Sequence, residues 1–265
     1  MCLLVLLVKE IISFLEDKYP PDLAFDWDNV GLQIGDVNAE VKKVMIALEA
    51  TSPVVEEAVA KGVDLLITHH PFFFTDLKFI DLNTPKGKNI AKLIKNGINL
   101  YSLHTNYDIA DDGMNDLLAR KIGLKNIKPF SMIDDVHGLG RIGEFETERA
   151  LYEFYDDLAY EWLAPVVRYV MIVDNDVEDR KVKKIAIIGG KGGQYLHDAK
   201  NAGADVFVTG DVDYHTAVEA KEIGLIMVDI GHHAEAHIAR HIASLLFDEF
   251  AVEAIVPTTS ENPFR

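Results

Sequence analysis

The residues best suited to chemistry are histidines and carboxylates that follow four short apolar runs. These runs and the residues after them are 63–68 with His69 and His70, 98–103 with His104 and Asp108, 206–209 with Asp211, Asp213 and His215, and 225–230 with His232, His233 and Glu235. The runs have the length and continuity of buried parallel strands. Ligands of open α/β sheets bind beyond the carboxyl ends of such strands. We therefore expect these side chains to gather at one edge.

The chemistry predicted for this set is metal binding. Imidazole and carboxylate without thiolate suit Zn, Mn, Fe or Co. Neighbours such as His69 and His70 point to opposite sides of an extended chain, so one ion would struggle to bind both. Five ligands drawn from this set would be too many for one closed tetrahedral site. They suit two adjacent divalent ions, at which water becomes a nucleophile. A single histidine after a strand is more often a partly buried cap, so the prediction depends on the whole set.

Two glycine-rich segments carry weaker signals. Gly138–Gly143 fits G-x-G-x-x-G, but no convincing strand precedes it and no helix follows at once, so dinucleotide binding is not expected. We interpret it as a tight turn that brings Arg141 near an anion. Gly189–Gly193 joins a strand at 185–188 to a helix from Gln194, and its N–H groups could cradle an anion. A flexible turn is the alternative interpretation.

The elements that position these residues show an internal repeat. The segment 41–46, VKKVMI, resembles the segment 182–187, VKKIAI, at a shift of 141 residues. The same shift pairs four further positions without a gap: Ala58 with Ala199, Gly62 with Gly203, Asp64 with Asp205, and Thr68 with Thr209. Each copy goes on to a further helix, a glycine and an apolar strand. Two copies indicate a duplicated α/β unit.

The predicted fold class is therefore α/β, with two similar lobes and largely parallel sheets. We place the first lobe at 1–130 and the second at 131–265, with 131–181 as a connecting segment. A helix is expected from Glu148 to Trp162 within that segment. The segment is too short for a typical separate domain.

Composition limits the partners. The chain of 265 residues has 26 Lys and Arg against 43 Asp and Glu, a net charge of −17. Such a charge disfavours nucleic acid as a partner, although a local positive site could attract a small anion. The single cysteine, Cys2, excludes an internal disulfide and a cysteine-rich metal site.

The apolar N-terminus predicts a helix over residues 3–19 that faces the core. Lys9 and Glu10 interrupt it well before the ~18 apolar residues that a membrane span needs. It also lacks the basic start and small-residue cleavage site of a signal peptide. We expect a cytoplasmic protein with no membrane partner.

Several motifs together resemble the NIF-three-like family, whose members are often labelled GTP cyclohydrolase I type 2 homologues. They are, in chain order, DWDNVGLQIGD (26–36), ITHHP (67–71), HTNYD (104–108), GLGRIG (138–143), TGDVDYH (209–215) and DIGHH (229–233). The match runs from about Leu7 to the C-terminus.

The resemblance implies two α/β lobes with a dinuclear metal site between them. The ligands implied are His69, His70, Asp108, His232 and a glutamate four residues after His232. This sequence has Ala236 there, and the nearest carboxylate is Glu235, three residues on. Positions three and four apart share a helix face, so Glu235 is the expected fifth ligand, although a displaced and weaker site is the alternative.

Two further histidines match family positions that do not ligate metal. These are His104 and His215, which could act as catalytic acid–base groups or orient the ligands. The resemblance also implies toroidal homo-oligomers, commonly hexamers. It suggests that an extra domain carried by some relatives is absent from this chain.

Three functions remain open on the sequence. The first is a metal-dependent hydrolase for a small anionic substrate of nucleotide-like character, with Arg141 and Gly189–Gly193 as possible anion sites. The second is a non-catalytic, regulatory metal-binding protein, suggested by the shifted Glu235. The third is a ring with a locally basic lumen that binds nucleic acid, which the net charge disfavours.

Overall fold

The structure, a computed structural model, describes residues 5–161, 168–170, 180–259 and 262–263. It divides into two compact units. Unit 1 runs to Tyr107 and resumes from Ala236 to Pro263, whereas unit 2 comprises Asp108–Glu235. The chain therefore passes between the units after Tyr107 and again after Glu235.

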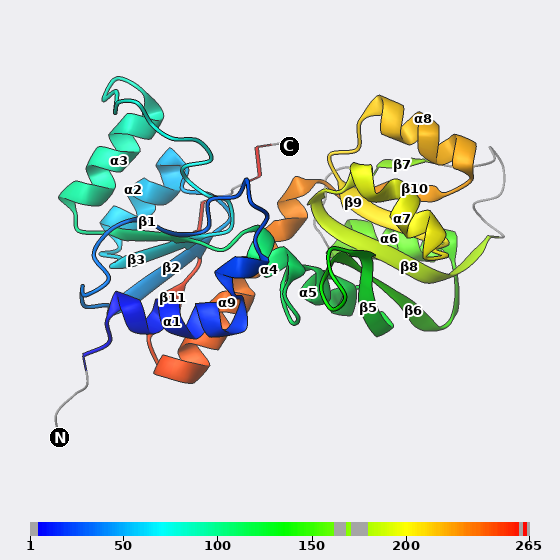
Figure 1. The fold of residues 1–265 in the computed structure, drawn as a ribbon, viewed down its shortest axis with the longest axis horizontal. Helices are drawn as coiled ribbons and strands as arrows, with labels where there is room; N and C mark the ends of the chain where they lie inside the picture. Colours follow the sequence, from blue (N-terminus) through cyan, green and yellow to red (C-terminus); the bar gives the residue numbers. More distant parts are fainter. Residues whose placement is uncertain (1–4, 162–167, 171–179, 260–261, 264–265) are drawn as a thin grey trace. The chain divides into compact units, whose positions relative to one another are not determined.

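Unit 1 is built on a five-stranded sheet with the order β1-β4-β3-β2-β11. Its elements are α1 (Val8–Lys18), η1 (Pro21–Leu23), β1 (Gly31–Ile34), β2 (Lys43–Ala47), α2 (Ser52–Ala60), β3 (Leu65–Thr68), α3 (Pro85–Lys95), β4 (Asn99–Ser102), α9 (His237–Phe250) and β11 (Glu253–Ile255). All strands except β1 run parallel. Helices α2 and α3 cover one face, and α1 and α9 lie on the other (Figure 1). Apolar side chains on both faces make these strands the buried core.

Unit 2 is built on a six-stranded sheet with the order β5-β6-β8-β9-β10-β7. Its elements are α5 (Met114–Lys121), β5 (Lys125–Met132), β6 (Gly138–Ala150), α6 (Leu151–Glu161), β7 (Arg168–Val170), β8 (Lys181–Lys191), η2 (Gly193–Tyr195), α7 (Leu196–Asn201), β9 (Val206–Gly210), α8 (Tyr214–Ile223), β10 (Ile226–Asp229) and η3 (His232–Ala236). Strands β8, β9 and β10 run parallel, and the other pairings are antiparallel. The parallel arrangement predicted for this lobe is thus confined to its duplicated strands.

The duplication is confirmed by matching contacts. The order β2-α2-β3-α3-β4 corresponds to β8-α7-β9-α8-β10. Asp64 accepts the backbone N–H groups of Lys42 and Lys43, at 2.8 and 2.9 Å. The Asp205 carboxylate, 141 positions later, does the same for Lys183 and Lys184, at 2.9 and 2.8 Å. The α/β fold class with two similar lobes therefore holds.

The compact units differ from the predicted lobes. Strand β11 pairs with β2, and α9 packs on the same strand, so the C-terminal segment belongs to unit 1. Residues 108–130 belong to unit 2, because α5 and β5 pack on β6. The predicted connecting segment 131–181 carries β6, α6 and β7 and is part of the second sheet. The predicted helix ends at Glu161, and Trp162 lies outside the described residues.

The segment Gly138–Gly143 is not a turn but part of strand β6. Arg141 within it is 1% exposed and serves no anion site. Its guanidinium donates to the Asp116 carboxylate at 2.7 Å. It also donates to four backbone carbonyls, those of Gly138, Gly140, Ile109 and Ala110, at 2.9–3.1 Å. A buried cation with five acceptors is a structural cross-link.

The N-terminal helix is shorter than predicted, since α1 begins at Val8. Leu7 instead forms a β-bridge with Glu40. Within the described residues, no helix has both the length and the apolar character needed to cross a membrane.

The cross-link at Arg141 gives a stability prediction. Arg141→Met removes the donor that the buried Asp116 carboxylate and four carbonyls share, so the free energy of unfolding should fall by about 3–5 kcal/mol. Lys92→Met, which removes the exposed pair of Lys92 with Glu56, should cost less than about 1 kcal/mol. Urea unfolding followed by circular dichroism measures both changes, and equal effects would contradict the assigned role.

Candidate metal centre

Three histidines of unit 1 follow the carboxyl ends of parallel strands. His69 and His70 come directly after β3, and His104 comes two residues after β4. One ring nitrogen from each lies within 4.8 Å of the other two. His69 is fully buried, and the side chains of His70 and His104 are 11% and 14% exposed. The predicted gathering at the strand ends is confirmed within this unit.

The Nδ1 atom of each of these rings is held by an oxygen acceptor. His69 Nδ1 lies 2.8 Å from the carbonyl oxygen of Leu103. His70 Nδ1 lies 3.1 Å from Glu49 Oε1, and His104 Nδ1 lies 2.9 Å from Asp28 Oδ1. A carbonyl or a carboxylate can only accept, so Nδ1 must carry the proton. The neutral ring then has its lone pair on Nε2, as metal ligation requires.

Asp28 is a second anchor in this unit. Its buried carboxylate accepts Thr105 Oγ1–H at 2.5 Å and Thr105 N–H at 3.0 Å, besides the His104 ring. Burial raises the pKa of Asp28. The hydrogen bonds from His104 and Thr105, together with the charge of the His104 ring when it is protonated, outweigh burial, so the pKa lies below its usual value of 3.8. The rings of Trp27 and Phe74 contact His104 edge-on, with centroids 5.9 and 5.7 Å away.

Unit 2 positions His232 after its third parallel strand. His232 Nδ1 lies 2.7 Å from Asp211 Oδ2, so Nδ1 again carries the proton of the neutral ring. Asp211 follows β9 in a left-handed conformation, with φ +52°. Aspartate adopts this region more readily than most residues. The carboxylate–histidine pair is the arrangement that orients histidine ligands in metal proteins.

Glu235 lies beside His232 despite its shifted position. Its Oε2 is 3.1 Å from His232 Nε2, and the residue is 3% exposed. Both residues belong to η3, a 3-10 helix, in which positions three apart lie directly above one another. Two ligand atoms that each lie ~2.0–2.2 Å from one tetrahedral ion are separated from each other by about as much as these two atoms are. The 3-10 turn therefore accommodates the spacing of three.

Gly189 and Gly190, near the carboxyl end of β8, pack against Glu235. A Cβ on Gly190, which has φ +59°, would lie 2.4 Å from Glu235 Oε1 and 3.4 Å from His232 Nε2. The loop is fixed by Thr209 Oγ1, which accepts Gly192 N–H at 2.9 Å and donates to Gly190 O at 3.1 Å. These contacts favour close packing behind Glu235, so neither an anion cradle nor a flexible turn describes the segment.

Asp108 lies in α4 (Thr105–Ile109), the short helix in which the chain leaves unit 1. Its carbonyl accepts Asn115 Nδ2–H at 2.9 Å, and Asn115 Oδ1 accepts Gly189 N–H at 2.9 Å. Asn115 thus ties the backbone at Asp108 to the glycines that pack on Glu235. Arg141 holds the next two carbonyls, as described above.

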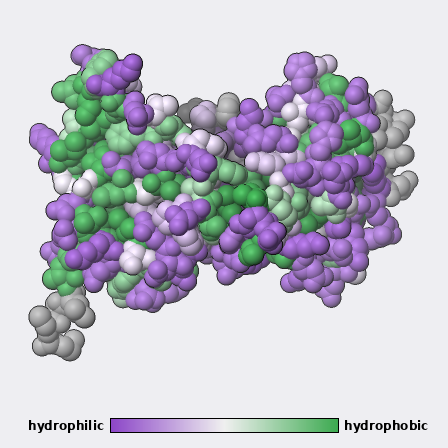
Figure 2. Space-filling model, viewed as in Figure 1, coloured by the Kyte–Doolittle hydropathy of each residue, from purple (hydrophilic) through white to green (hydrophobic). Residues whose placement is uncertain are grey.

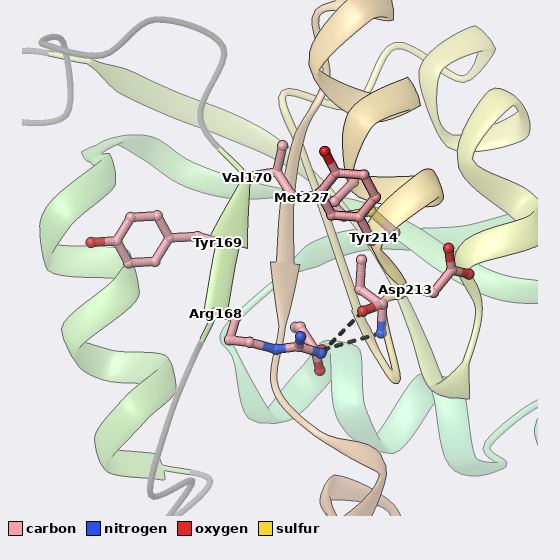
Figure 3. Close-up of a pocket in the computed structure, with 9 residues that line it drawn as sticks. Arg168, Tyr169, Val170, Asp213, Tyr214 and Met227 are labelled. Carbon is pink, nitrogen blue, oxygen red and sulfur yellow. Dashed lines mark hydrogen bonds and ion pairs between the residues drawn. The ribbon is translucent and has the colours of Figure 1, made fainter.

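His215 is placed apart from this constellation. It lies on the exposed first turn of α8, with its ring 5.5 Å from that of Tyr214. A cavity of about 260 Å³ lies nearby, lined by Arg168, Val170, Tyr214 and Met227 among others. Figure 3 shows Tyr214 next to Met227 and Val170, while Tyr169 points away from them. The guanidinium of Arg168 is engaged by Asp229 and by the Val212 carbonyl.

Two residues that help to fix this arrangement, Glu49 and Asn115, were not selected from the sequence. Glu49 follows β2, so the strand-end rule could have found it, as it found Asp211 after β9. Asn115 lies inside α5 and carries no such signal. Groups of histidine and acidic side chains in the described residues could hold a metal ion.

Comparisons with known proteins agree with the motifs. A family model described as Duf34/NIF3 (NGG1p interacting factor 3) matches residues 6–263. The chain is 36% identical over 263 residues to the GTP cyclohydrolase 1 type 2 homolog of Clostridium perfringens, with 97% of this chain and 98% of that protein covered. The homolog of Bacillus subtilis is 29% identical over an alignment of 364 positions, so it carries sequence that this chain lacks.

Solved structures show the same similarity. A Staphylococcus aureus protein superposes with a TM-score of 0.90 at 31% identity, covering 98% of this chain and 99% of that one. HcgD of Methanocaldococcus jannaschii has a TM-score of 0.82 at 32% identity, with 97% and 100% covered. With the family model matching nearly the whole sequence, the chain belongs to the Duf34/NIF3 family.

Proposed function

We propose that this protein is a metal-dependent hydrolase of small anionic substrates. The proposed ligands of two divalent ions are His69, His70, Asp108, His232 and Glu235. The supporting observation is that Nδ1 of each of the three histidines lies against an oxygen acceptor, which makes Nε2 the ring atom that would bind a metal. The passage of the chain between units after Tyr107 and Glu235 keeps Asp108 and Glu235 close in sequence to unit 1.

Divalent ions bound by this set would acidify water and stabilise negative charge that develops on a substrate oxygen. The chain itself supplies a proton-transfer group in His104. Asp28 holds its Nδ1–H, so Nε2 can accept a proton while the carboxylate stabilises the imidazolium that results. We therefore propose His104 as the general base or acid. The exposed position of His215 gives it no comparable support.

The hydrolase is preferred to a purely regulatory metal protein. The regulatory interpretation began from the shifted glutamate, but the 3-10 turn brings Glu235 against His232. The names of relatives suggest GTP as one substrate to test. The homo-hexameric ring implied by the motifs belongs to the same proposal, and the net charge of −17 argues against a nucleic-acid partner.

Metal content is the first test. Protein purified without chelator should carry about two ions per chain, measured by mass spectrometry of the metals. His70→Ala and Asp108→Ala should each lower this number, because each removes a proposed ligand. His197→Ala, which alters a surface histidine paired with Glu219, should leave it unchanged. A parent protein with fewer than about one ion per chain, and the same metal content in His70→Ala, would contradict the proposal.

The packing at Gly190 predicts a separate effect on affinity. Gly190→Ala should weaken metal binding ~10–100-fold, because the new Cβ displaces the Glu235 carboxylate. Gly62→Ala is the matched control: Gly62 also has a positive φ, of +63°, but a Cβ there meets nothing within 4 Å. Both variants should lose about 1 kcal/mol of stability. Competition with a fluorescent chelator measures the affinity, and equal affinities in the two variants would refute the steric argument.

Turnover separates His104 from the ligands. With GTP and 4-nitrophenyl phosphate as probes, His104→Gln should lower kcat ~10²–10⁴-fold while the metal content stays at the parent value. Asp28→Asn should also lower kcat and change the pH profile, since the ring loses its carboxylate partner. A metal-replete protein without turnover of any phosphate ester or nucleotide would favour the regulatory alternative.

A further inference from the structure

A second feature of unit 1 borders the proposed centre. It is a cavity of about 310 Å³, and His70 is one of its lining residues. The first turns of α2 and α3 form part of its wall through Ser52 and Lys86, and Phe72 and Phe74 form another part. The volume is at the lower end of the ~300–1,000 Å³ typical of ligand pockets. A small molecule that reaches His70 could therefore fill it.

Lys86 is the basic side chain of this cavity. Its ammonium lies 5.2 Å from the ring centroid of Phe72 and 5.5 Å from that of Phe73. Two aromatic faces fix the position of the charge without neutralising it. In the part of the chain that the structure describes, no carboxylate forms an ion pair with Lys86. The side chain is exposed to solvent, so its charge is available to an anion that enters the cavity.

The start of α2 adds to the positive potential. Thr51, its N-cap residue, makes no side-chain capping hydrogen bond, whereas Thr84 caps α3 by accepting Gly87 N–H at 3.1 Å. The side chain of Ser52 is turned to the buried Asn89, whose Oδ1 accepts its hydroxyl at 3.2 Å. The first amides of α2 thus have no side-chain acceptor from Thr51. The N-terminal end of a helix favours an anion.

We propose that this cavity is the subsite for a phosphate group of the substrate, with Lys86 as its counter-charge. The inference rests on the proposed hydrolase and names its substrate class, a small phosphorylated compound. The acidic side chain in the cavity, Glu49, is bonded to His70, so the phosphate lies toward Lys86 and the scissile bond toward His70. Phe72 and Phe74 contact the organic part.

The surroundings of the cavity fit an organic substituent. The loop 71–84 exposes five large apolar side chains: Phe74, Leu77, Phe79, Ile80 and Leu82. Figure 2 shows hydrophobic surface over α3 and the loop before it. Phe74 is 50% exposed and contacts the His104 ring as well as the cavity. An apolar rim beside a single fixed cation is the pattern of pockets that bind organic anions.

Binding of inorganic phosphate to chelator-treated protein tests the subsite without any metal. Calorimetry should show binding to the parent, and Lys86→Glu should weaken it ~10–100-fold, since a charge-assisted contact becomes a repulsion. Lys88→Glu is the matched control, because Lys88 lies two residues further in α3 and outside the cavity lining. No phosphate binding by the parent, or equal loss in both variants, overturns the subsite.

Turnover by the metal-loaded protein separates this inference from the hydrolase itself. Lys86→Ala should raise KM for GTP, which carries phosphate groups besides the one at the scissile bond, about tenfold and leave KM for the neutral 4-nitrophenyl acetate unchanged. Turnover that is insensitive to Lys86 for both substrates overturns the subsite and leaves the hydrolase standing. Phosphate binding that depends on Lys86, in a protein without turnover, supports the subsite and overturns the hydrolase.

Discussion

Parallel pairing of three strands in each unit is the constraint on which the centre depends. In β2-β3-β4 and in β8-β9-β10 the carboxyl ends of neighbouring strands come to the same edge. Successive loops must therefore leave the sheet side by side, however far apart they are in sequence. The duplicated strands keep this geometry, while the antiparallel strands added at the edges of the second sheet contribute no proposed ligand. The polar residues sit where the buried strands stop.

A second constraint acts on the rings themselves. An imidazole at a strand end can rotate and change tautomer, and either change would remove a proposed ligand. The acceptors at Leu103, Glu49 and Asp211 prevent both by holding Nδ1–H. One is a backbone carbonyl and two are carboxylates that follow other strands of the same sheet. The fold thus supplies both the histidines and the groups that orient them.

The sequence predicted much of this arrangement because strand periodicity and the repeat are local signals. The shift of 141 residues matched β9 with β3 in sequence, and the strand-end rule selected His69, His70, His104 and His232. Sequence reasoning failed for Arg141, because an arginine in a glycine-rich segment gives the same pattern whether it contacts an anion or five buried acceptors. It also missed the return of α9 and β11 to the first sheet, which is a long-range pairing without a local pattern.

What the sequence alone determined is the residue types, their spacing and the duplicated α/β plan. It left open whether Glu235, three residues after His232, lies beside that histidine. Only the tertiary structure decided this, because the three residues per turn of η3 bring Glu235 Oε2 to 3.1 Å from His232 Nε2. The cation at Lys86 was likewise invisible, since its place beside a cavity depends on rings and helix ends that only the folded chain assembles.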